Sequence, residues 1–341
     1  MAKQILDSKK IISAKVCAIV LNWNNWRDTL ECLDSLTATM PCPDSIIVCD
    51  NGSTDDSVEK ILQWAVSKGE KVLRINGDEG IFSRLTDKVV RLILITNSTN
   101  LGYSGGNNVG ISYVLAQEQF DFVWVLNNDT LVAKDSLKEL LSCVRQSKAG
   151  IFGSTVVYHS APERIQCAGG MRYNPLTTIF RPVLGGHSLP EVLFVRDHPP
   201  IDYIYGASFF VRTEVFEKCG LFNEDFFLFY EELDFCRRAR AKGYSLYWCR
   251  ESIVEHKVSQ SVGSADEKNK GKKVISSYHE NLSTLLYTHL HHKNILPIVM
   301  VFRFLGKLAI IILRQEWYLI QPLVKAYRDF MRRRREDSSS A

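Results

Sequence analysis

The sequence predicts an α/β fold in which a mainly parallel sheet is covered by helices on both faces. Short apolar runs bounded by polar residues alternate with segments that carry apolar residues at helical spacing. Each predicted strand is followed by Asn or Asp, at the edge where such sheets bind their ligands. The chain has 341 residues, of which 45% are hydrophobic, so it can bury a substantial core.

The strands and helices of this sheet are expected to alternate along the N-terminal part of the chain. The predicted strands are residues 16–21, 45–49, 92–96 and 122–126. The predicted helices are residues 27–36, 58–66 and about 108–116, and the charged stretch 68–88 is expected to be a surface insertion. The polar segments that follow the strands, and therefore contain the candidate site residues, are 22–25, 50–56, 97–108 and 127–130.

Composition and charge exclude several classes of protein. The net charge of +4 is too small to indicate nucleic-acid binding. The nine cysteines contain no C-x-x-C pair and often lie in apolar runs, which favours reduced thiols in a cytosolic protein over disulfides or a zinc site. The start, MAKQILDSKK, has no apolar segment, so we expect no secretion signal. No uninterrupted apolar run is long enough to predict a membrane-spanning helix.

Two of the polar segments have the residue types of a nucleotide site. DNGSTDDS, residues 50–57, could be a capped turn or could place Asp50 to accept a hydrogen bond from a nucleobase. NSTNLGYSGGNNVGI, residues 97–111, could be an irregular loop or a close backbone approach to a ligand, with amides supplied by Asn100 and Asn107. It matches neither the P-loop nor the dinucleotide-binding pattern.

Two further segments have the residue types of a divalent-cation site. WVLNNDT, residues 124–130, offers one carboxylate, Asp129, and suits Mg²⁺ or Mn²⁺ bound partly by water and phosphate. His256 follows another apolar stretch and could supply a second ligand. The alternatives are a polar strand end and a structural histidine.

A cluster of acids lies directly behind a run of aromatic residues. In FFLFYEELDFCRR, residues 226–238, the acids are Glu231, Glu232 and Asp234. They could begin a helix and complement its dipole, or they could face a reactive pocket. The two interpretations are compatible, since the same acids can do both.

In this order and spacing, the motifs resemble the inverting family 2 glycosyltransferases of the GT-A fold, in particular the rhamnosyltransferase-like branch. The resemblance runs from about residue 14 to 281 and also includes AIVLNWNNW, VEHKVSQS and SSYHENLSTLLYTH. The implied fold is a mixed, mainly parallel, Rossmann-like sheet flanked by helices, with a C-terminal amphipathic helical segment.

The resemblance implies a nucleotide-sugar site and a metal site. The expected nucleotide-sugar residues are Asn22, Asn24, Asp50, Asn51, Asn100, Gly102, Asn107, Asn127 and Asn128. Asn127 stands where the family's D-x-D motif has its first acid. The expected ligands of Mg²⁺ or Mn²⁺ are therefore Asp129 and His256.

The resemblance also implies a catalytic base and an acceptor site. Where the family has Glu-Asp-x-Asp, this chain has Glu231, Glu232, Leu233 and Asp234, which puts Glu232 in the place of the base. Glu231 and Asp234 are expected to support it. The expected acceptor-binding residues are Gly206, Ala207, Ser208 and Phe229, with Phe226 and Phe227 in the same aromatic wall.

The C-terminal segment has an amphipathic pattern. At about 100° per residue its cations fall within one arc, at Arg303, Lys307, Arg314, Lys325, Arg328 and Arg332. Its apolar residues lie opposite, at Val301, Leu305, Leu308, Ile312, Leu319, Leu323 and Phe330. Pro322 is expected to kink or split it. The pattern predicts a helix in an anionic membrane interface; the alternative is packing on the catalytic domain or on a second subunit.

The predicted domains are an N-terminal extension at 1–13, a catalytic domain at 14–265 and a helical, basic region at 266–341. The nucleotide half of the catalytic domain is about 14–130 and the acceptor half about 131–265. The polar stretch 259–273 is expected to be a mobile loop or linker.

The predicted function is transfer of L-rhamnose from dTDP-L-rhamnose to a hydroxyl of a glycan or lipid-linked acceptor in surface polysaccharide biosynthesis. The alternatives are a UDP-hexose or UDP-galactofuranose donor, or an inactive protein that binds nucleotide sugar or carbohydrate. The expected location is cytoplasmic, at the inner face of the membrane, and a homodimer is one expected assembly.

Overall fold

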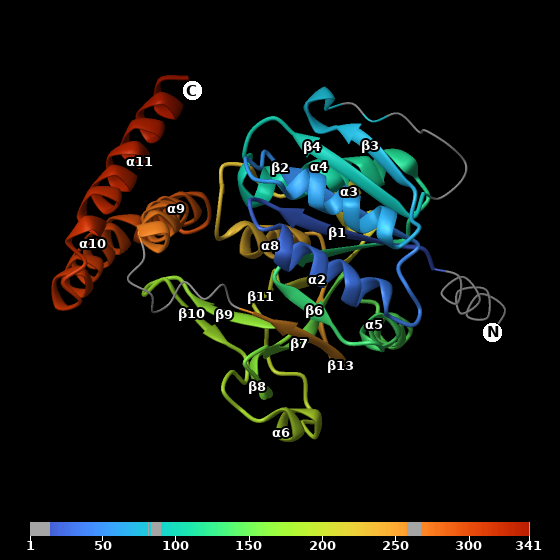
Figure 1. The fold of residues 1–341 in the computed structure, drawn as a ribbon. Helices are drawn as coiled ribbons and strands as arrows, with labels where there is room; N and C mark the ends of the chain where they lie inside the picture. Colours follow the sequence, from blue (N-terminus) through green and yellow to red (C-terminus); the bar gives the residue numbers. More distant parts are fainter. Residues whose placement is uncertain (1–13, 81, 83–89, 258–266, 341) are drawn as a thin grey trace.

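The computed structural model describes residues 14–80, 82, 90–257 and 267–340. Its centre is a ten-stranded mixed sheet with the order β3-β4-β2-β1-β5-β12-β7-β13-β6, to which β8 adds by pairing with β7. The parallel half consists of β1 (Val16–Asn22), β2 (Ser45–Asn51), β3 (Val72–Asn76), β4 (Leu92–Asn97) and β5 (Phe122–Asn127). The α/β fold class is confirmed (Figure 1).

The second half of the sheet is mixed in direction. Its strands are β6 (Thr130–Val132), β7 (Ile151–Tyr158), β8 (Ala161–Ala168), β12 (Ser208–Arg212) and β13 (Leu246–His256). β12 runs antiparallel to both β5 and β7, whereas β13 is parallel to β7. A separate small antiparallel sheet consists of β9 (Gly170–Asn174), β10 (Ile179–Pro182) and β11 (Tyr203–Ile204).

Helices cover both faces of the large sheet because successive side chains of each strand point to opposite sides. One core contains alternate residues of β1 together with α2 (Trp26–Thr37), α3 (Ser57–Ser67) and α5 (Ser136–Gln146). The other core contains the intervening residues with α4 (Gly102–Gln117), α7 (Thr213–Cys219) and α8 (Glu231–Ala241). Short helices α6 (Leu189–Leu193) and η1 (Gly77–Glu79) complete this part.

Two expectations about the parallel half are wrong. The stretch 68–88 is not only an insertion, because β3 lies within it and pairs in parallel with β4 at the edge of the sheet. The helix expected from residue 108 begins at Gly102. A Cβ on Gly106 would lie 2.5 Å from Leu21 Cδ1, so this glycine lets the helix approach β1 closely. From the sequence, the glycines that allow this close packing were interpreted as part of a loop.

The C-terminal region is helical, as expected, with α9 (Glu267–His291), α10 (Leu296–Leu313) and α11 (Ile320–Ser340), joined by η2 (Lys293–Ile295) and η3 (Trp317–Leu319). These helices lie at one side of the sheet (Figure 1). The expected split occurs at Gln315, whose φ is 54°, and Pro322 lies in the first turn of α11. Of the expected loop at 259–273, residues 259–266 lie outside the described residues and the rest is helical.

A helix packed on a soluble protein is expected to turn its apolar side inward and its cations outward, but in α10 cations face the protein and apolar side chains are exposed. The Arg303 side chain, 7% exposed, lies against α9, whereas the apolar Leu305 is 56% exposed. By length and composition alone, Lys293–Leu313 could cross a membrane, and among the described residues it is the one such helix. The sequence indicated none, because the cations interrupt its apolar run. All nine cysteines are free, as expected.

Candidate active site

The carboxyl ends of β1 and β2 carry a buried polar network. Asn22 donates to Asp50 Oδ1 at 2.7 Å and to Ser53 Oγ at 3.1 Å, and it accepts from Thr29 at 2.7 Å. Asp50 is 2% exposed, and its other oxygen accepts from the Ser53 backbone N–H. Asn24 Oδ1 accepts from the backbone N–H groups of residues 54 and 55. The expected nucleotide residues therefore also brace the DNGSTDDS turn.

A second network joins β2 to the start of α4. Asn51 donates to Asn100 Oδ1 and to Gly102 O, both at 2.9 Å, and accepts from the Leu101 N–H at 3.1 Å. Gly102 has a φ of 75°, and a Cβ there would overlap the backbone oxygen of Phe227. Only glycine fits this contact, which brings the helix start against the aromatic run.

The remaining predicted nucleotide residues differ in accessibility. Asn107 is fully buried and donates to Tyr103 O, and its Oδ1 has no partner among the described residues. Asn128 donates to Thr29 Oγ1 at 3.0 Å and to Asn25 O at 3.3 Å, so its amide faces the start of α2. Asn127, at the end of β5, is partly exposed.

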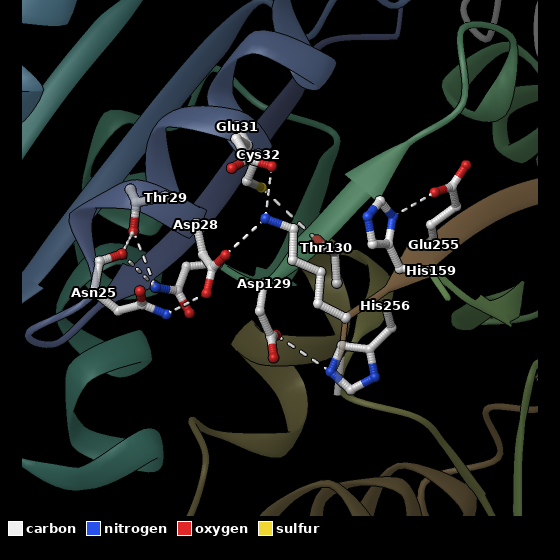
Figure 2. A network of polar contacts seen from close by, with 12 residues as sticks. Asn25, Asp28, Thr29, Glu31, Cys32, Asp129, Thr130, His159, Glu255 and His256 are labelled. Atoms are coloured by element: carbon white, nitrogen blue, oxygen red, sulfur yellow. Dashed lines mark hydrogen bonds and ion pairs between the residues drawn. The ribbon is translucent and has the colours of Figure 1, made fainter. Parts of the chain in front are cut away.

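Asp129 and His256 come together although they are far apart in the sequence. His256 Nε2 lies 3.2 Å from Asp129 Oδ1, and β13 pairs with β6 so that His256 lies opposite Thr130 (Figure 2). Gln166 donates to Val157 O and His256 O, which leaves its Oε1 to accept from His256 Nδ1–H at 2.9 Å. Nε2 then presents a lone pair toward the carboxylate, and a proton or a cation between the two atoms relieves their repulsion.

Lys257 fixes the end of β13 to α2 beside this pair. Its Nζ lies 2.6 Å from both Asp28 Oδ1 and Glu31 Oε2, and its backbone N–H donates to Asp129 O at 2.9 Å. Sequence reasoning missed Gln166 and Lys257. The position of Lys257 next to His256 was a usable signal, whereas nothing local marks Gln166.

Glu232, the predicted base, lies against the turn that precedes β12. A Cβ on Gly206 would overlap Glu232 Oε1 and lie 2.9 Å from Tyr103 Oη, so only glycine admits the carboxylate here. Burial raises the pKa of Glu232 to about 7, although hydrogen bonds from the backbone, Glu231 and Gly206 oppose the shift. Tyr103, which sequence reasoning missed, donates to Gly206 O at 3.3 Å.

Glu231 is buried beside the base. Burial, and then the negative charge of Glu232, raise the pKa of Glu231 well above its ordinary value, which favours the protonated carboxyl. Its Oε2 has no hydrogen-bond partner among the described residues. In its protonated form Glu231 can donate to Glu232, which keeps only one negative charge in the pair.

Asp234 has an opposite environment. It is fully buried and lies 2.7 Å from both Arg238 Nε and His291 Nε2, the latter from α9. Burial alone would raise the pKa of Asp234, but the hydrogen bond from His291 and the charge of Arg238 outweigh it and lower the pKa.

The aromatic run is held in a strained conformation before α8. Phe229 and Tyr230 have φ values of 69° and 76°, which non-glycine residues seldom adopt. Contacts on two sides hold the run: Tyr103 N–H donates to Phe227 O at 2.7 Å, and Ser283 of α9 donates to Leu228 O at 2.9 Å. Contacts with α4 and α9 thus fix where α8 begins.

The predicted acceptor residues are only partly accessible. Ala207 is buried, and Ser208, also buried, accepts from Trp124 Nε1 at 3.0 Å. Both stabilise the strand that follows the turn. Gly206 and the partly exposed Phe229 lie nearer α8. Tyr205, beside Gly206, packs its ring against His256 with 5.8 Å between centroids and so links the turn beside Glu232 to the Asp129–His256 pair.

Comparison with known proteins places this arrangement in a family. The family model described as glycosyl transferase family 2 matches residues 17–219, and a second, glycosyl transferase family group 2, matches residues 122–320. The low-salt glycan biosynthesis hexosyltransferase Agl10 of Haloferax volcanii is 32% identical over 162 residues, 46% of this chain. Those residues are 48% of the relative, so the chain spans about half its length.

A second relative matches over a longer range. The N-acetylglucosaminyl-diphospho-decaprenol L-rhamnosyltransferase of Mycobacterium tuberculosis is 26% identical over 251 residues, which are 66% of this chain and 70% of the relative. Among solved structures, the mannosyltransferase PcManGT from Pyrobaculum calidifontis, in complex with GDP-Man and Mn²⁺, has a TM-score of 0.51 at 14% identity. It covers 96% of this chain and 94% of its own, and it shows the same fold. The chain belongs to glycosyltransferase family 2.

Proposed function

We propose that the chain is an inverting glycosyltransferase that moves a sugar from a nucleotide-sugar donor to a hydroxyl of an acceptor. The observation that carries the proposal is Glu232, a half-buried residue whose carboxylate has a pKa of about 7 and lies against Gly206 at the same sheet edge as Asp129 and His256. A base works best when its pKa lies near the pH at which it acts.

In the proposed reaction, Glu232 takes the proton of the acceptor hydroxyl as that oxygen attacks the anomeric carbon. The new bond joins acceptor oxygen to the anomeric carbon, and the bond from that carbon to the diphosphate oxygen breaks on the opposite face. The electron pair leaves with the nucleoside diphosphate. Most of the remaining rate acceleration comes from holding the two substrates in position.

Asp129 and His256 fit a divalent cation. Their facing oxygen and nitrogen atoms suit Mg²⁺ or Mn²⁺, and the hydrogen bond from Nδ1 to Gln166 fixes the ring for this role. No group of three or more His, Cys, Asp or Glu side chains forms a metal cage within the described ranges. Diphosphate oxygens and water would complete the coordination, and such a cation neutralises charge on the departing diphosphate.

The proposed nucleotide-sugar site consists of the two asparagine networks at the ends of β1, β2 and β5 and at the start of α4. Its residues are Asn22, Asn24, Asp50, Asn51, Asn100, Gly102, Asn107, Asn127 and Asn128. Because several of them are buried, we propose that they shape the pocket through the turns they brace as well as by direct contact.

The proposed donor is dTDP-L-rhamnose, supported by the M. tuberculosis relative, whose name gives L-rhamnose transfer. The Haloferax relative is named a hexosyltransferase, which keeps a UDP-hexose, or UDP-galactofuranose, as the alternative donor. The other alternative is an inactive nucleotide-sugar-binding protein, to which the Asn127 and Glu232 departures from the family pattern would point.

The proposed acceptor is a glycan hydroxyl, and a lipid-linked one is favoured because the M. tuberculosis relative is named for a diphospho-decaprenol acceptor. Such an acceptor would place the enzyme at the cytoplasmic face of a membrane. A homodimer is the alternative use of the C-terminal helices.

The first experiment is a screen of nucleotide sugars for thermal stabilisation of the protein with Mn²⁺, Mg²⁺ or EDTA. A ligand that binds only the native state raises its melting temperature, and we expect dTDP-L-rhamnose with a metal to raise it most. The bound donor is then offered to lipid-linked and glycan acceptors, with wild type and Glu232→Gln in parallel. If both proteins bind the donor and neither transfers it to any acceptor, the enzyme proposal fails.

A further inference from the structure

The face of α10 that lies against the protein combines two cations with apolar side chains, among them the buried Leu296 and Ile311. Arg303 donates to Asn281 Oδ1 at 3.1 Å, to Thr178 Oγ1 at 2.8 Å and to Glu280 Oε1 at 3.0 Å. Lys307, one turn further on, lies 2.8 Å from the same carboxylate. Burial alone would raise the pKa of Glu280, but these two cations outweigh it and lower the pKa. Two cations therefore hold α10 to α9 in addition to the apolar contacts.

The outer face of α10 is apolar and uncovered in the monomer. Its exposed residues recur at helical spacing, within an arc of roughly 120° at 100° per residue. Phe302 is 70% exposed, Leu305 56% and Leu313 82%. The other exposed apolar side chains of this helix are Ile298, Val301, Ile310 and Ile312. We call the set formed by Ile298, Val301, Phe302, Leu305, Ile312 and Leu313 the α10 outer face.

Charge and aromatic residues around this face match an anionic lipid surface. α10 itself, LPIVMVFRFLGKLAIIIL, contains no acid. Lys293 and Arg314 are exposed just outside its two ends, and Trp317 and Tyr318 follow, 56% and 37% exposed. Cations and amphipathic aromatic rings at the borders of an apolar surface are typical of contact with lipid headgroups. Lys325, Arg328, Arg332 and Arg335 are also exposed on α11.

We propose that the α10 outer face docks on a bilayer that contains anionic phospholipid, with α10 lying in the plane of the interface. The helix does not span the bilayer, because spanning would carry Arg303 and Lys307 into lipid and separate them from Glu280. The cations at its ends contact headgroups while its apolar side chains enter the acyl boundary.

This surface is connected to the proposed base. α9, to which α10 is ion-paired, also donates from Ser283 to Leu228 O and contacts Asp234 through His291. A docked α10 therefore holds the aromatic run and α8 near the lipid surface, where a lipid-linked acceptor would present its sugar. The inference deepens the proposed function and rests on it only for the identity of that acceptor.

The test measures binding of the full chain to vesicles without any nucleotide sugar. Vesicles of phosphatidylcholine are compared with vesicles that also contain about one third phosphatidylglycerol. We expect wild type to co-sediment with the anionic vesicles, and Phe302→Glu with Leu305→Glu to lower the bound fraction roughly tenfold or more. Val66→Glu is the matched control, since Val66 is an exposed apolar residue of α3, and its binding should equal that of wild type.

Three outcomes would overturn the inference. The first is equal binding of wild type and the double variant to anionic vesicles. The second is no binding of wild type to either vesicle. The third is a wild-type dimer that the double variant converts to monomer without any vesicle binding, which would assign the face to a second copy. Failure of the proposed function looks different, because vesicle binding would persist while no sugar is transferred.

Discussion

The first turn of α8 contains the pair Glu231 and Glu232 and, two residues further on, Asp234, and the pair and Asp234 have opposite electrostatic environments. At Glu231 and Glu232, burial raises both pKa values, and no cation is among the causes. At Asp234, Arg238 and His291 lower the pKa despite complete burial. The pair keeps a proton near neutral pH and Asp234 keeps a charge.

The difference comes from the neighbours that each acid meets, not from the acids themselves. The Glu pair faces the Gly206 turn and Tyr103, which offer backbone N–H groups and a buried phenol. Asp234 faces α9 and the guanidinium one turn further along its own helix. The first environment suits proton transfer, and the second suits holding α8 against α9.

The largest effect is expected for Glu232→Gln, which removes the proposed base without changing its size. We expect kcat to fall by about 10²–10⁴ while donor binding, measured by thermal shift, is kept. In wild type the rate should rise with pH up to about 7, because the base acts only when deprotonated. Glu232→Asp shortens the same carboxylate by one methylene. Equal turnover of wild type and Glu232→Gln would show that Glu232 is not the base, and Glu232 would then not differ in function from Asp234.

The next effect is on stability. Asp234→Ala leaves Arg238 and His291 without their shared partner, so we expect the free energy of unfolding to fall by about 2–3 kcal/mol. Chemical denaturation at pH 7 measures it. Glu217→Ala, at an exposed position of α7, is the control and should change stability by less than about 0.5 kcal/mol. A small loss for Asp234→Ala would show that the two ion pairs do little to hold α8.

A third change separates activity from folding. Gly206→Ala puts a Cβ where Glu232 Oε1 lies, and since the end of that side chain can move, we expect little loss of stability. A displacement of about 1 Å can lower the rate by roughly 10²-fold. Gly271→Ala in α9, where a Cβ meets nothing within 4 Å, is the control and should retain full activity. Unchanged kcat in Gly206→Ala would argue against Glu232 as the base.

The fourth expected effect is on the pH dependence of stability. The pKa of Glu231 in the folded state lies above the 4.5 of its unfolded form, so folding takes up a proton at pH values between the two pKa values. The stabilisation is complete below pH 4.5 and is lost as pH rises toward the folded pKa.

Glu231→Gln removes that titration. As the pH rises from 5 to 8, the variant should therefore become more stable relative to wild type, which a comparison of melting temperatures measures. The difference in unfolding free energy should grow by at most about 1.4 kcal/mol per pH unit. Parallel curves for the two proteins would show that Glu231 is ionised in the folded state and would make it like Asp234.

Much of the fold could be predicted from local pattern. Apolar runs and helical spacing gave β1, β2, β4 and β5 with the helices between them, because side-chain period is a local property. The polar residues at the strand ends were found for the same reason. β3 was missed, since no residue of Val72–Asn76 is fully buried and the strand lies at the sheet edge.

The candidate site was predictable in its residue types but not in its partners. Asp129 and His256 were expected together, and they lie 3.2 Å apart. Gln166 reaches the site through strand pairing that joins distant parts of the chain, so no local motif marks it. Lys257 and Tyr103 lie next to predicted site residues, but the sequence did not show which partners they contact. Whether each predicted residue takes its assigned role stays a prediction.

By itself, the sequence determined that the chain forms a mainly parallel sheet covered by helices, with amides and acids at its strand ends. The reason is that apolar periodicity and turn formation depend on residues close together in the sequence. It also determined that α10 has a cationic side and an apolar side. Only the tertiary structure decided which side faces the protein, because Glu280 of α9 pairs with Arg303 and Lys307. Only it decided that, of three neighbouring acids, two have raised pKa values while the third is held ionised, since each pKa depends on groups contributed by other elements.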